Sequence, residues 1–269
     1  MKKAVAIILA LMLTLGCAGA LGETTKVKIG VVGENNEQWN QVIIPMLKEE
    51  GIEIELVKFS DYVIPNQALA DKEIDLNAFQ HYNFMNNWSK EHGVELVAIA
   101  DTLIAPLCIY SQKIKSLDEI NDGDGVAIMN DVVNEARALR MLEAAGFIKL
   151  KEDITELATV ADIAENRLNL QFNEMEASLT ASAMSDPSIA IAFLNGTHAK
   201  DAGLTNDQAL YMEQYDPENP DMHGIINIIA ARAEDAENPV YKRIAEAYHT
   251  DEVRALFETV YKGVYLPAF

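Results

Sequence analysis

The chain has 269 residues, of which 49% are hydrophobic and 23% charged, with 21 Lys and Arg side chains against 42 Asp and Glu. This composition excludes a disordered chain and provides enough residues for one large domain or two moderate ones. The formal charge of −21 disfavours a nucleic-acid binder and a protein that lies on anionic membranes, because both need basic surfaces.

The N-terminus predicts an export signal rather than part of the fold. MKK supplies a positive start, and AVAIILALMLTL is an apolar stretch too short for a comfortable membrane span. The Gly-Cys pair that follows resembles a bacterial lipobox, which predicts a signal peptide over residues 1–16, a lipid on Cys17 and a linker over residues 17–25. An A-x-A cleavage signal ending at Ala20 is the alternative, and both routes export the mature chain.

The second cysteine is expected to be a structural residue. The chain has two cysteines, so lipidation of Cys17 leaves Cys108 without a disulfide partner. A lone cysteine most simply packs as a small buried hydrophobic side chain. No disulfide is therefore expected.

The mature chain alternates predicted strands and helices, with apolar residues at every second position in the strands and at helical spacing in the helices. Strands are expected at residues 27–32, 52–59, 94–100, 125–130, 154–159, 189–195 and 225–231. Helices are expected at residues 36–51, around 68–70, through 84–88, and at 116–119, 134–146, 160–168, 239–249 and 251–261. This order predicts parallel sheets and an α/β fold. Two successive sets of these units predict two lobes, joined in part by the turn-rich stretch 216–224.

Common enzyme motifs are missing from the sequence. The five histidines have no metal-ligand spacing, and there is no C-x-x-C, G-x-S-x-G, Walker A or G-x-G-x-x-G motif. We therefore expect no catalysis, no metal and no cofactor. An exported, acidic, two-lobed α/β chain favours a receptor that encloses a small solute between its lobes.

The segment NDVVNEARALRML suits the carboxylate of an amino-acid ligand. It follows the strand at 125–130, so its helix begins at the sheet edge where ligands approach in α/β folds. Arg137 lies one helical turn from Asn134 and can point back toward the helix start, where its planar fork would pair with a carboxylate. The alternative is an exposed arginine on an amphipathic helix, which is the interpretation given to Arg140.

Ordered blocks over residues 26–269 resemble the methionine-binding lipoproteins of bacterial ABC importers, the NlpA and MetQ-like lipoproteins. The most specific blocks are SDYVIPNQALADKEIDLNAFQH, IYSQKIKSLDEI, the Asn-Asp…Arg-Ala-Leu segment, the segment around Asn195, and NIIAAR followed by TDEV and a terminal PAF. The resemblance implies a two-lobed fold of the type II periplasmic-binding-protein kind, with two interlobe crossings. It implies a first lobe from residues 26–110 and 223–269, and a second lobe from residues 111–222.

The resemblance also implies a set of ligand-binding residues. Arg137 would hold the ligand carboxylate, and Asn195 and Asn227 would bind its polar α-groups. The side chains that would enclose the thioether are Tyr62, Phe79 and His81. The second choices are Tyr110 and Asn134. Independently of the resemblance, Asn227 lies in an apolar strand, where an unpaired amide is costly, and this favours a bound polar partner.

Some neighbouring residues are interpreted differently. Three aromatic residues after the FQH block are interpreted as core packing: Tyr82, Phe84 and Trp88. Four places depart from the family pattern: the turn at 33–36, Ala78, Val132 and the stretch 179–181. These places lie near loops expected to line the cleft, so they bear on which amino acid fits.

The predicted protein is an extracytoplasmic lipoprotein of the cell membrane, anchored through Cys17. It would bind methionine or a closely related amino acid and deliver it to an ABC permease with its ATPase, without contact with nucleic acid. One alternative keeps the binding fold but changes the role, to a receptor for another amino acid or small peptide, or to an adhesion or signalling module. The other is an exported hydrolase or isomerase that uses His81 with Asp61 as acid and base.

Overall fold

The computed structural model describes residues 24–154, 157–216, 218–261 and 264–269. The predicted signal peptide and Cys17 lie outside these residues, and so does the Ala20 cleavage signal. Within the described residues, no helix is both long and apolar enough to cross a membrane.

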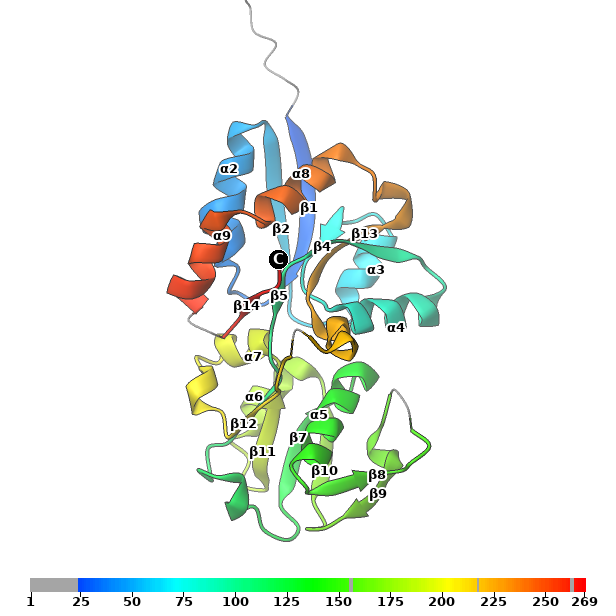
Figure 1. The fold of residues 1–269 in the computed structure, drawn as a ribbon, viewed down its shortest axis with the longest axis vertical. Coiled ribbons are helices and arrows are strands. Elements are labelled where there is room, and N and C mark those ends of the chain that lie inside the picture. Colours follow the sequence, from blue (N-terminus) through cyan, green and yellow to red (C-terminus); the bar gives the residue numbers. More distant parts are fainter. Residues whose placement is uncertain (1–23, 155–156, 217, 262–263) are drawn as a thin grey trace, which may run out of the picture.

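The chain forms two lobes stacked along the long axis of the molecule, each built on its own five-stranded sheet (Figure 1). In the first lobe the strand order is β2-β1-β3-β13-β4. The strands are β1 Thr25–Val32, β2 Ile52–Phe59, β3 Leu76–Asn77, β4 Leu96–Asp101 and β13 Ile228–Arg232. β1 pairs in parallel with β2 and β3, whereas β13 runs antiparallel to β3 and β4.

Helices cover both faces of the first sheet because its strands bury residues on both sides. The helices are a π-helical segment Gln38–Ile43 leading into α2 Ile44–Glu49, α3 Ile64–Ala70, α4 Tyr82–His92, α8 Pro239–Tyr248, and α9 Asp251–Leu256 followed by a π-helical segment Phe257–Tyr261. In β13, Ile229 and Ala231 pack in the core that includes α8 and α9. Ile228 and Ala230 point to the opposite core, against α3 and α4.

The second lobe has the sheet order β10-β7-β11-β6-β12. Its strands are β6 Cys108–Tyr110, β7 Gly125–Met129, β10 Gln171–Met175, β11 Ile189–Leu194 and β12 Tyr211–Met212. Its helices are α5 Val132–Ala144, α6 Thr180–Ala183 and α7 Gly196–Asp201, with short 3-10 turns at Leu117–Glu119, Val160–Asp162, Ala177–Leu179 and Asn206–Gln208. Val126 and Ile128 of β7 face the core beneath α5, and Ala127 faces α6 and α7.

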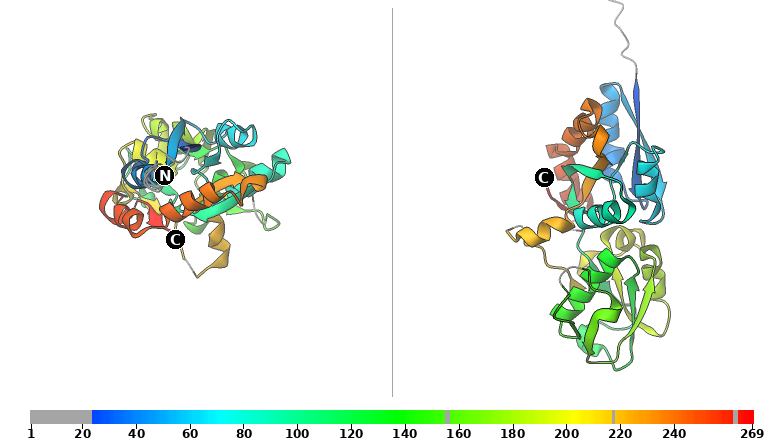
Figure 2. Two further views of the ribbon diagram at one scale, coloured as in Figure 1. Left: turned by 90° about the horizontal axis from the view of Figure 1, so that it is seen from above. Right: turned by 90° about the vertical axis from the view of Figure 1, so that its right-hand side faces the viewer.

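The chain passes between the lobes twice. The first passage leaves β5 Leu103–Ile104, which pairs with β14 Leu266–Pro267, and enters β6. The second returns from β12 to β13 through residues 213–216 and 218–227. Figure 2 shows that the molecule is narrow where the two lobes meet. The two-lobed α/β fold is thereby confirmed. Because β6 pairs with β11 of the second sheet, we propose that the first crossing ends before Cys108 and not at Tyr110.

One predicted strand and one predicted helix are wrong. Residues 154 and 157–159 form no strand, and the stretch 160–168 is not a helix. It forms a 3-10 turn followed by β9 Ile163–Asn166, which pairs antiparallel with β8 Ile148–Leu150. Apolar residues spaced along this stretch suited a helix, but they reach the second-lobe core without one: Val160 from the 3-10 turn, Ile163 from β9 and Leu168 from the turn after it. Pairing with β8 satisfies the backbone there.

Candidate ligand-binding site

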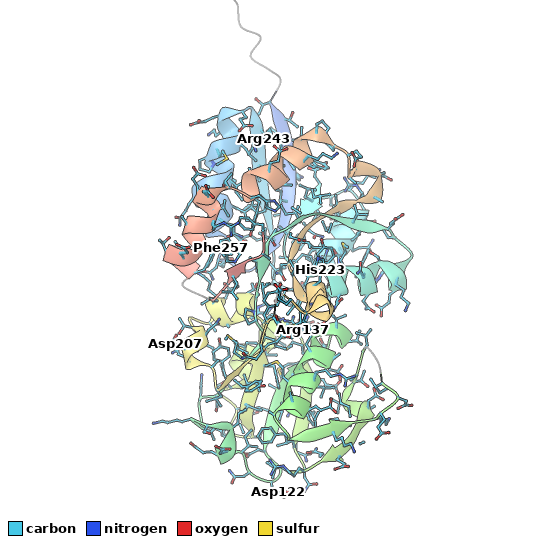
Figure 3. The ribbon with its side chains drawn as sticks, viewed as in Figure 1. Asp122, Arg137, Asp207, His223, Arg243 and Phe257 are labelled. Carbon is cyan, nitrogen blue, oxygen red and sulfur yellow. The ribbon has the colours of Figure 1, made fainter. Side chains whose placement is uncertain are left out.

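A cavity lies between the two lobes, and the space inside it together with its open mouth is about 360 Å³. Residues of both lobes line it: Tyr62, Phe79, Gln80, His81, Phe84, Ala105, Asn134, Arg137, Asn195, Gly196, Thr197 and Asn227. Figure 3 shows Arg137 at the junction of the lobes. The structure therefore brings seven of the eight predicted binding residues to one cavity.

Aromatic rings from the first lobe form one wall of this cavity. The rings of Tyr62 and Phe79 are stacked with centroids 5.9 Å apart, and Phe84 contacts both edge-on at 6.2 and 6.0 Å. The interpretation of Phe84 as core packing is therefore wrong, because the first turn of α4 directs this ring at the cavity. Trp88 does pack in the first-lobe core. The wall offers a surface suited to an apolar or thioether side chain.

His81 combines a structural role with a place in the cavity. It is the N-cap of α4, and its Nδ1 accepts a hydrogen bond from the Phe84 backbone N–H at 3.2 Å. This bond places the proton on Nε2, which lies 3.5 Å from Asn134 Oδ1. Burial, with the nearby Arg137 charge, lowers the pKa of the His81 imidazole to about 3. His81 is therefore neutral at physiological pH.

Asn134 connects the polar groups of the site. Its Oδ1 accepts from Arg137 Nη1 and from Asn195 Nδ2, both at 3.0 Å. Its Nδ2 donates to both carboxylate oxygens of Asp131, the N-cap of α5, at 2.9 and 3.0 Å. Since Asn134 is only 2% exposed, these bonds fix its orientation and, through it, the positions of Arg137 and Asn195.

Arg137 has a protein carboxylate as partner, which the sequence did not predict. Its Nε donates to Glu213 Oε1 at 3.1 Å and its Nη2 to Glu213 Oε2 at 2.5 Å. Both side chains are largely buried, with 10% and 14% exposed. Glu213 lies 76 residues away in the return crossing, and no local pattern marks it. With the bond to Asn134, Arg137 uses three of its five N–H groups on described residues, which leaves two for a ligand.

Asn195 offers an acceptor to the cavity. Its Nδ2 is bonded to Asn134, but its buried Oδ1 has no hydrogen-bond partner in the described part of the chain. An unpaired buried carbonyl is costly, so this position indicates a ligand donor. Asn227 lies on the opposite lobe, where its Nδ2 donates to the Phe79 carbonyl at 3.4 Å. The two asparagines thus face the cavity from different lobes.

Two residues singled out from the sequence lie in the second-lobe core. Tyr110 is 2% exposed in β6, packs in the core against α6 and α7, and does not line the cavity. Cys108 is 1% exposed and lies in the same core, which confirms the prediction of a buried cysteine. The alternation of β6 explains both positions, because Cys108 and Tyr110 point to one face and Ile109 to the other.

Sequence reasoning missed several lining residues. Gln80 belongs to the FQH block, and its side chain forms a buried amide network with Asn66 and Asn77 at 2.7 to 3.0 Å. This network holds the backbone between Phe79 and His81.

Gly196 is required where α7 begins, because a Cβ there would lie 2.7 Å from the Tyr265 ring.

Helix α7 contacts the first lobe beyond the cavity. Its Thr197 is hydrogen-bonded to Tyr62, and the His198 ring lies 5.0 Å from the Tyr62 ring. Farther along α7, Lys200 Nζ donates to Asn35 Oδ1 at 2.9 Å and approaches Glu37 Oε1 at 3.3 Å. These contacts hold the lobes together on one side of the cavity.

Asp201, the last residue of α7, contacts the turn at 33–36, which departs from the family pattern. Its carboxylate accepts from the Glu34 backbone N–H at 3.3 Å and from Asn35 Nδ2. Gly33 has a φ of +78°, and a Cβ there would lie 2.5 Å from Asp201 Oδ2, so the close approach requires glycine. The turn at 33–36 therefore forms an interlobe contact rather than a wall of the cavity.

No group of three or more His, Cys, Asp or Glu side chains suited to a metal occurs among the residues the structure describes. The chemistry offered by the cavity is that of recognition. It provides an arginine fork, an unpaired amide oxygen and an apolar aromatic wall, which match the carboxylate, ammonium and side chain of an apolar amino acid.

Comparisons with known proteins agree with this arrangement. The family model of the NlpA lipoproteins matches residues 27–269. The chain is 38% identical to the D-methionine-binding lipoprotein MetQ of Yersinia pestis over 266 residues, or 97% of this chain and 96% of that protein. Among solved structures, the substrate-binding protein of a methionine transporter from Streptococcus pneumoniae superposes with a TM-score of 0.85 at 40% identity, covering 92% of this chain and 97% of that one. A nutrient-binding protein from Burkholderia cenocepacia bound to methionine gives a TM-score of 0.84 at 35% identity, covering 90% and 100%.

Proposed function

Since this chain belongs to the NlpA lipoprotein family, we propose that it is the substrate-binding lipoprotein of a methionine ABC importer. The relatives named above bind methionine or serve methionine transport. The observation that carries the proposal is the buried Asn195 Oδ1 without a partner, beside an arginine with two unused N–H groups. Both open onto a cavity walled by aromatic rings.

The ligand would lie across the two lobes. Its carboxylate would accept hydrogen bonds from the two remaining N–H groups of Arg137, and its ammonium would donate a hydrogen bond to Asn195 Oδ1. Its thioether side chain would pack against the rings of Tyr62, Phe79 and Phe84. Since these groups come from different lobes, a bound ligand favours the conformation in which the lobes are closed.

A hydrolase or isomerase finds no support at His81. Both of its ring nitrogens have partners, Phe84 N–H on Nδ1 and Asn134 on Nε2. Asp61 instead accepts from the backbone N–H groups of Val63 and Ile64, at 2.8 and 3.0 Å. The two side chains therefore form no acid–base pair, and the chain is proposed to bind without catalysis.

Membership of the lipoprotein family supports a proposal for the cellular location. We propose that Cys17 carries the lipid anchor, so that the lobes stand on the extracytoplasmic face of the cell membrane beside the permease and its ATPase. Mass spectrometry of the mature N-terminus distinguishes this from cleavage after Ala20.

Methionine is expected to stabilise the mature protein strongly. A ligand at 100 times its Kd adds about 2.7 kcal/mol to the free energy of unfolding, which raises the Tm of a chain of this size by roughly 5–10 °C. Thermal unfolding with each of the common amino acids, with both enantiomers of methionine and with norleucine as a thioether-free control measures this. A larger shift with a different amino acid, or none with any of them, would contradict the proposal.

Replacing Asp201 with alanine is expected to weaken methionine binding roughly three- to tenfold, mainly through faster dissociation. The substitution removes the contacts of α7 with Glu34 and Asn35 and leaves the cavity residues in place. Stopped-flow fluorescence measures both rate constants. Asp122→Ala is the matched control, because Asp122 also accepts a side-chain hydrogen bond, from Asn169, but lies at the far end of the second lobe (Figure 3). Equal dissociation rates for the two variants would exclude the interlobe role.

A further inference from the structure

The ligand anchor Arg137 is neutralised before any ligand arrives. Glu213 contacts its guanidinium with both carboxylate oxygens, and the two side chains are 86% or more buried. Such a pair, held out of water, acts electrostatically as a unit without net charge. Two N–H groups of Arg137 remain available, but the unpaired positive charge that would attract any anion is absent.

Glu213 is itself fixed by the two interlobe crossings. Its Oε2 accepts from the Leu107 backbone N–H at 3.2 Å, and its own N–H donates to the Leu107 carbonyl at 2.8 Å. Leu107 belongs to the first crossing and Glu213 to the second. The carboxylate is therefore held against Arg137 by backbone bonds and does not depend on side-chain flexibility.

The other charged groups near the cavity add no positive charge. His81 is neutral, because burial lowers its pKa to about 3. The Asp131 carboxylate lies behind Asn134, which donates to both of its oxygens. The charges of Arg137 and Glu213 thus cancel at the place where the ligand carboxylate would bind. The carboxyl group of Asp131 lies nearby and adds no positive charge.

We propose that Glu213 is the residue that makes this site select a zwitterion and reject a thioether carboxylate that lacks the α-ammonium. The inference rests on the proposed function of methionine binding and assigns the charge selectivity of that same site. A carboxylate alone gains two hydrogen bonds from Arg137 but faces Glu213 and Asp131 without compensation. An α-ammonium beside Asn195 Oδ1 supplies that compensation. Glu213 acts through Arg137 and does not line the cavity, so it is a positioning residue.

Calorimetry on the mature wild-type protein with three ligands tests this first. The ligands are methionine, methioninamide (a cation) and deaminomethionine, in which hydrogen replaces the α-ammonium. Deaminomethionine is expected to bind at least about 30-fold more weakly than methionine, and no more tightly than methioninamide. If deaminomethionine binds within threefold of methionine, or more tightly than methioninamide, the inference is overturned.

Substitution of Glu213 provides the second test. Glu213→Gln keeps an oxygen acceptor and removes the charge, so the ratio of the methionine and deaminomethionine affinities is expected to narrow by about tenfold. Glu213→Asp keeps the charge and should retain the wild-type preference for the zwitterion. Glu246→Gln removes one charge from an exposed pair with Arg243 and serves as the matched control.

The outcomes separate the inference from the proposed function. If wild-type protein binds no methionine, the proposed function itself fails. If it binds methionine and Glu213→Gln leaves the affinity ratio at the wild-type value, the assignment to Glu213 fails. Should Glu213→Gln not fold, as judged by circular dichroism, the comparison of deaminomethionine with methioninamide on wild-type protein decides, because an Arg137 whose charge is not neutralised would favour the anion over the cation.

Discussion

Replacing Arg137 with alanine is expected to raise the Kd for methionine by at least about 100-fold, because two charged hydrogen bonds of about 1.5–3 kcal/mol each are lost. The same change is expected to lower the free energy of unfolding by about 3–5 kcal/mol, since it leaves the buried Glu213 carboxylate without its partner. Calorimetry measures the first effect and denaturant unfolding the second.

The neighbouring arginine of the same helix is the control. Arg140 pairs with Glu143 at 3.0 Å, and its side chain is 41% exposed, so Arg140→Ala should leave the Kd near the wild-type value and cost at most about 1 kcal/mol of stability. If Arg137→Ala binds methionine with wild-type affinity, Arg137 is not the carboxylate anchor. If it is as stable as Arg140→Ala, the pair with Glu213 does not exist in solution.

The second large effect is a loss of stability in acid that originates at His81. The folded-state pKa of about 3 lies below the ordinary value of about 6.5 that holds in the unfolded chain. Between these two values the unfolded state binds more protons, so the contribution of His81 is complete above about pH 6.5 and is lost as the pH falls toward 3. Titration of this one group changes the free energy of unfolding by at most about 1.4 kcal/mol per pH unit.

His81→Asn isolates this titration, because asparagine also caps a helix N-terminus and does not titrate. Denaturant unfolding of the ligand-free protein between pH 7 and pH 4 should give a shallower loss of stability for this variant than for wild type. Burial also lowers the pKa of His198. Part of the pH dependence of stability should therefore remain in His81→Asn, and His198→Asn should remove a separate part of it. Superimposable profiles for wild type and His81→Asn would show that His81 is not held neutral by the fold.

The FQH block shows how far local sequence information reached. The block placed Phe79 and His81 in the site, and the structure brings both to the cavity. It did not separate Phe84 from Trp88, because both lie on α4 and have the same apolar character. Their roles differ because Phe84 is in the first turn of α4, at the cavity, while Trp88 lies one turn farther on, against the first-lobe core.

The stretch 160–168 shows where periodicity was insufficient. Its apolar spacing suited a helix, yet the chain pairs β9 with β8. The capping bonds between Thr159 and Asp162 close a 3-10 turn just before the strand, and the apolar side chains of the turn and the strand pack against the second-lobe core. Local spacing alone does not choose between the two, because the partner strand lies in another part of the sequence.

Residue types at short, regular spacing were enough to predict most of the strands and helices and the two lobes, and they singled out Arg137 as a candidate for binding the ligand carboxylate. The surroundings of Arg137 could not be predicted in this way and depend on the folded chain. Glu213 pairs with Arg137, which lies 76 positions away in the sequence. Asn195 is hydrogen-bonded to Asn134 within the second lobe, and Asp201 contacts the turn at 33–36 of the first lobe. These contacts join residues that share no local pattern. The pairing of β7 with β11 brings Asn134 and Asn195 together within the second lobe. The return crossing brings Glu213 to Arg137, and the approach of the two lobes brings Asp201 to the turn at 33–36.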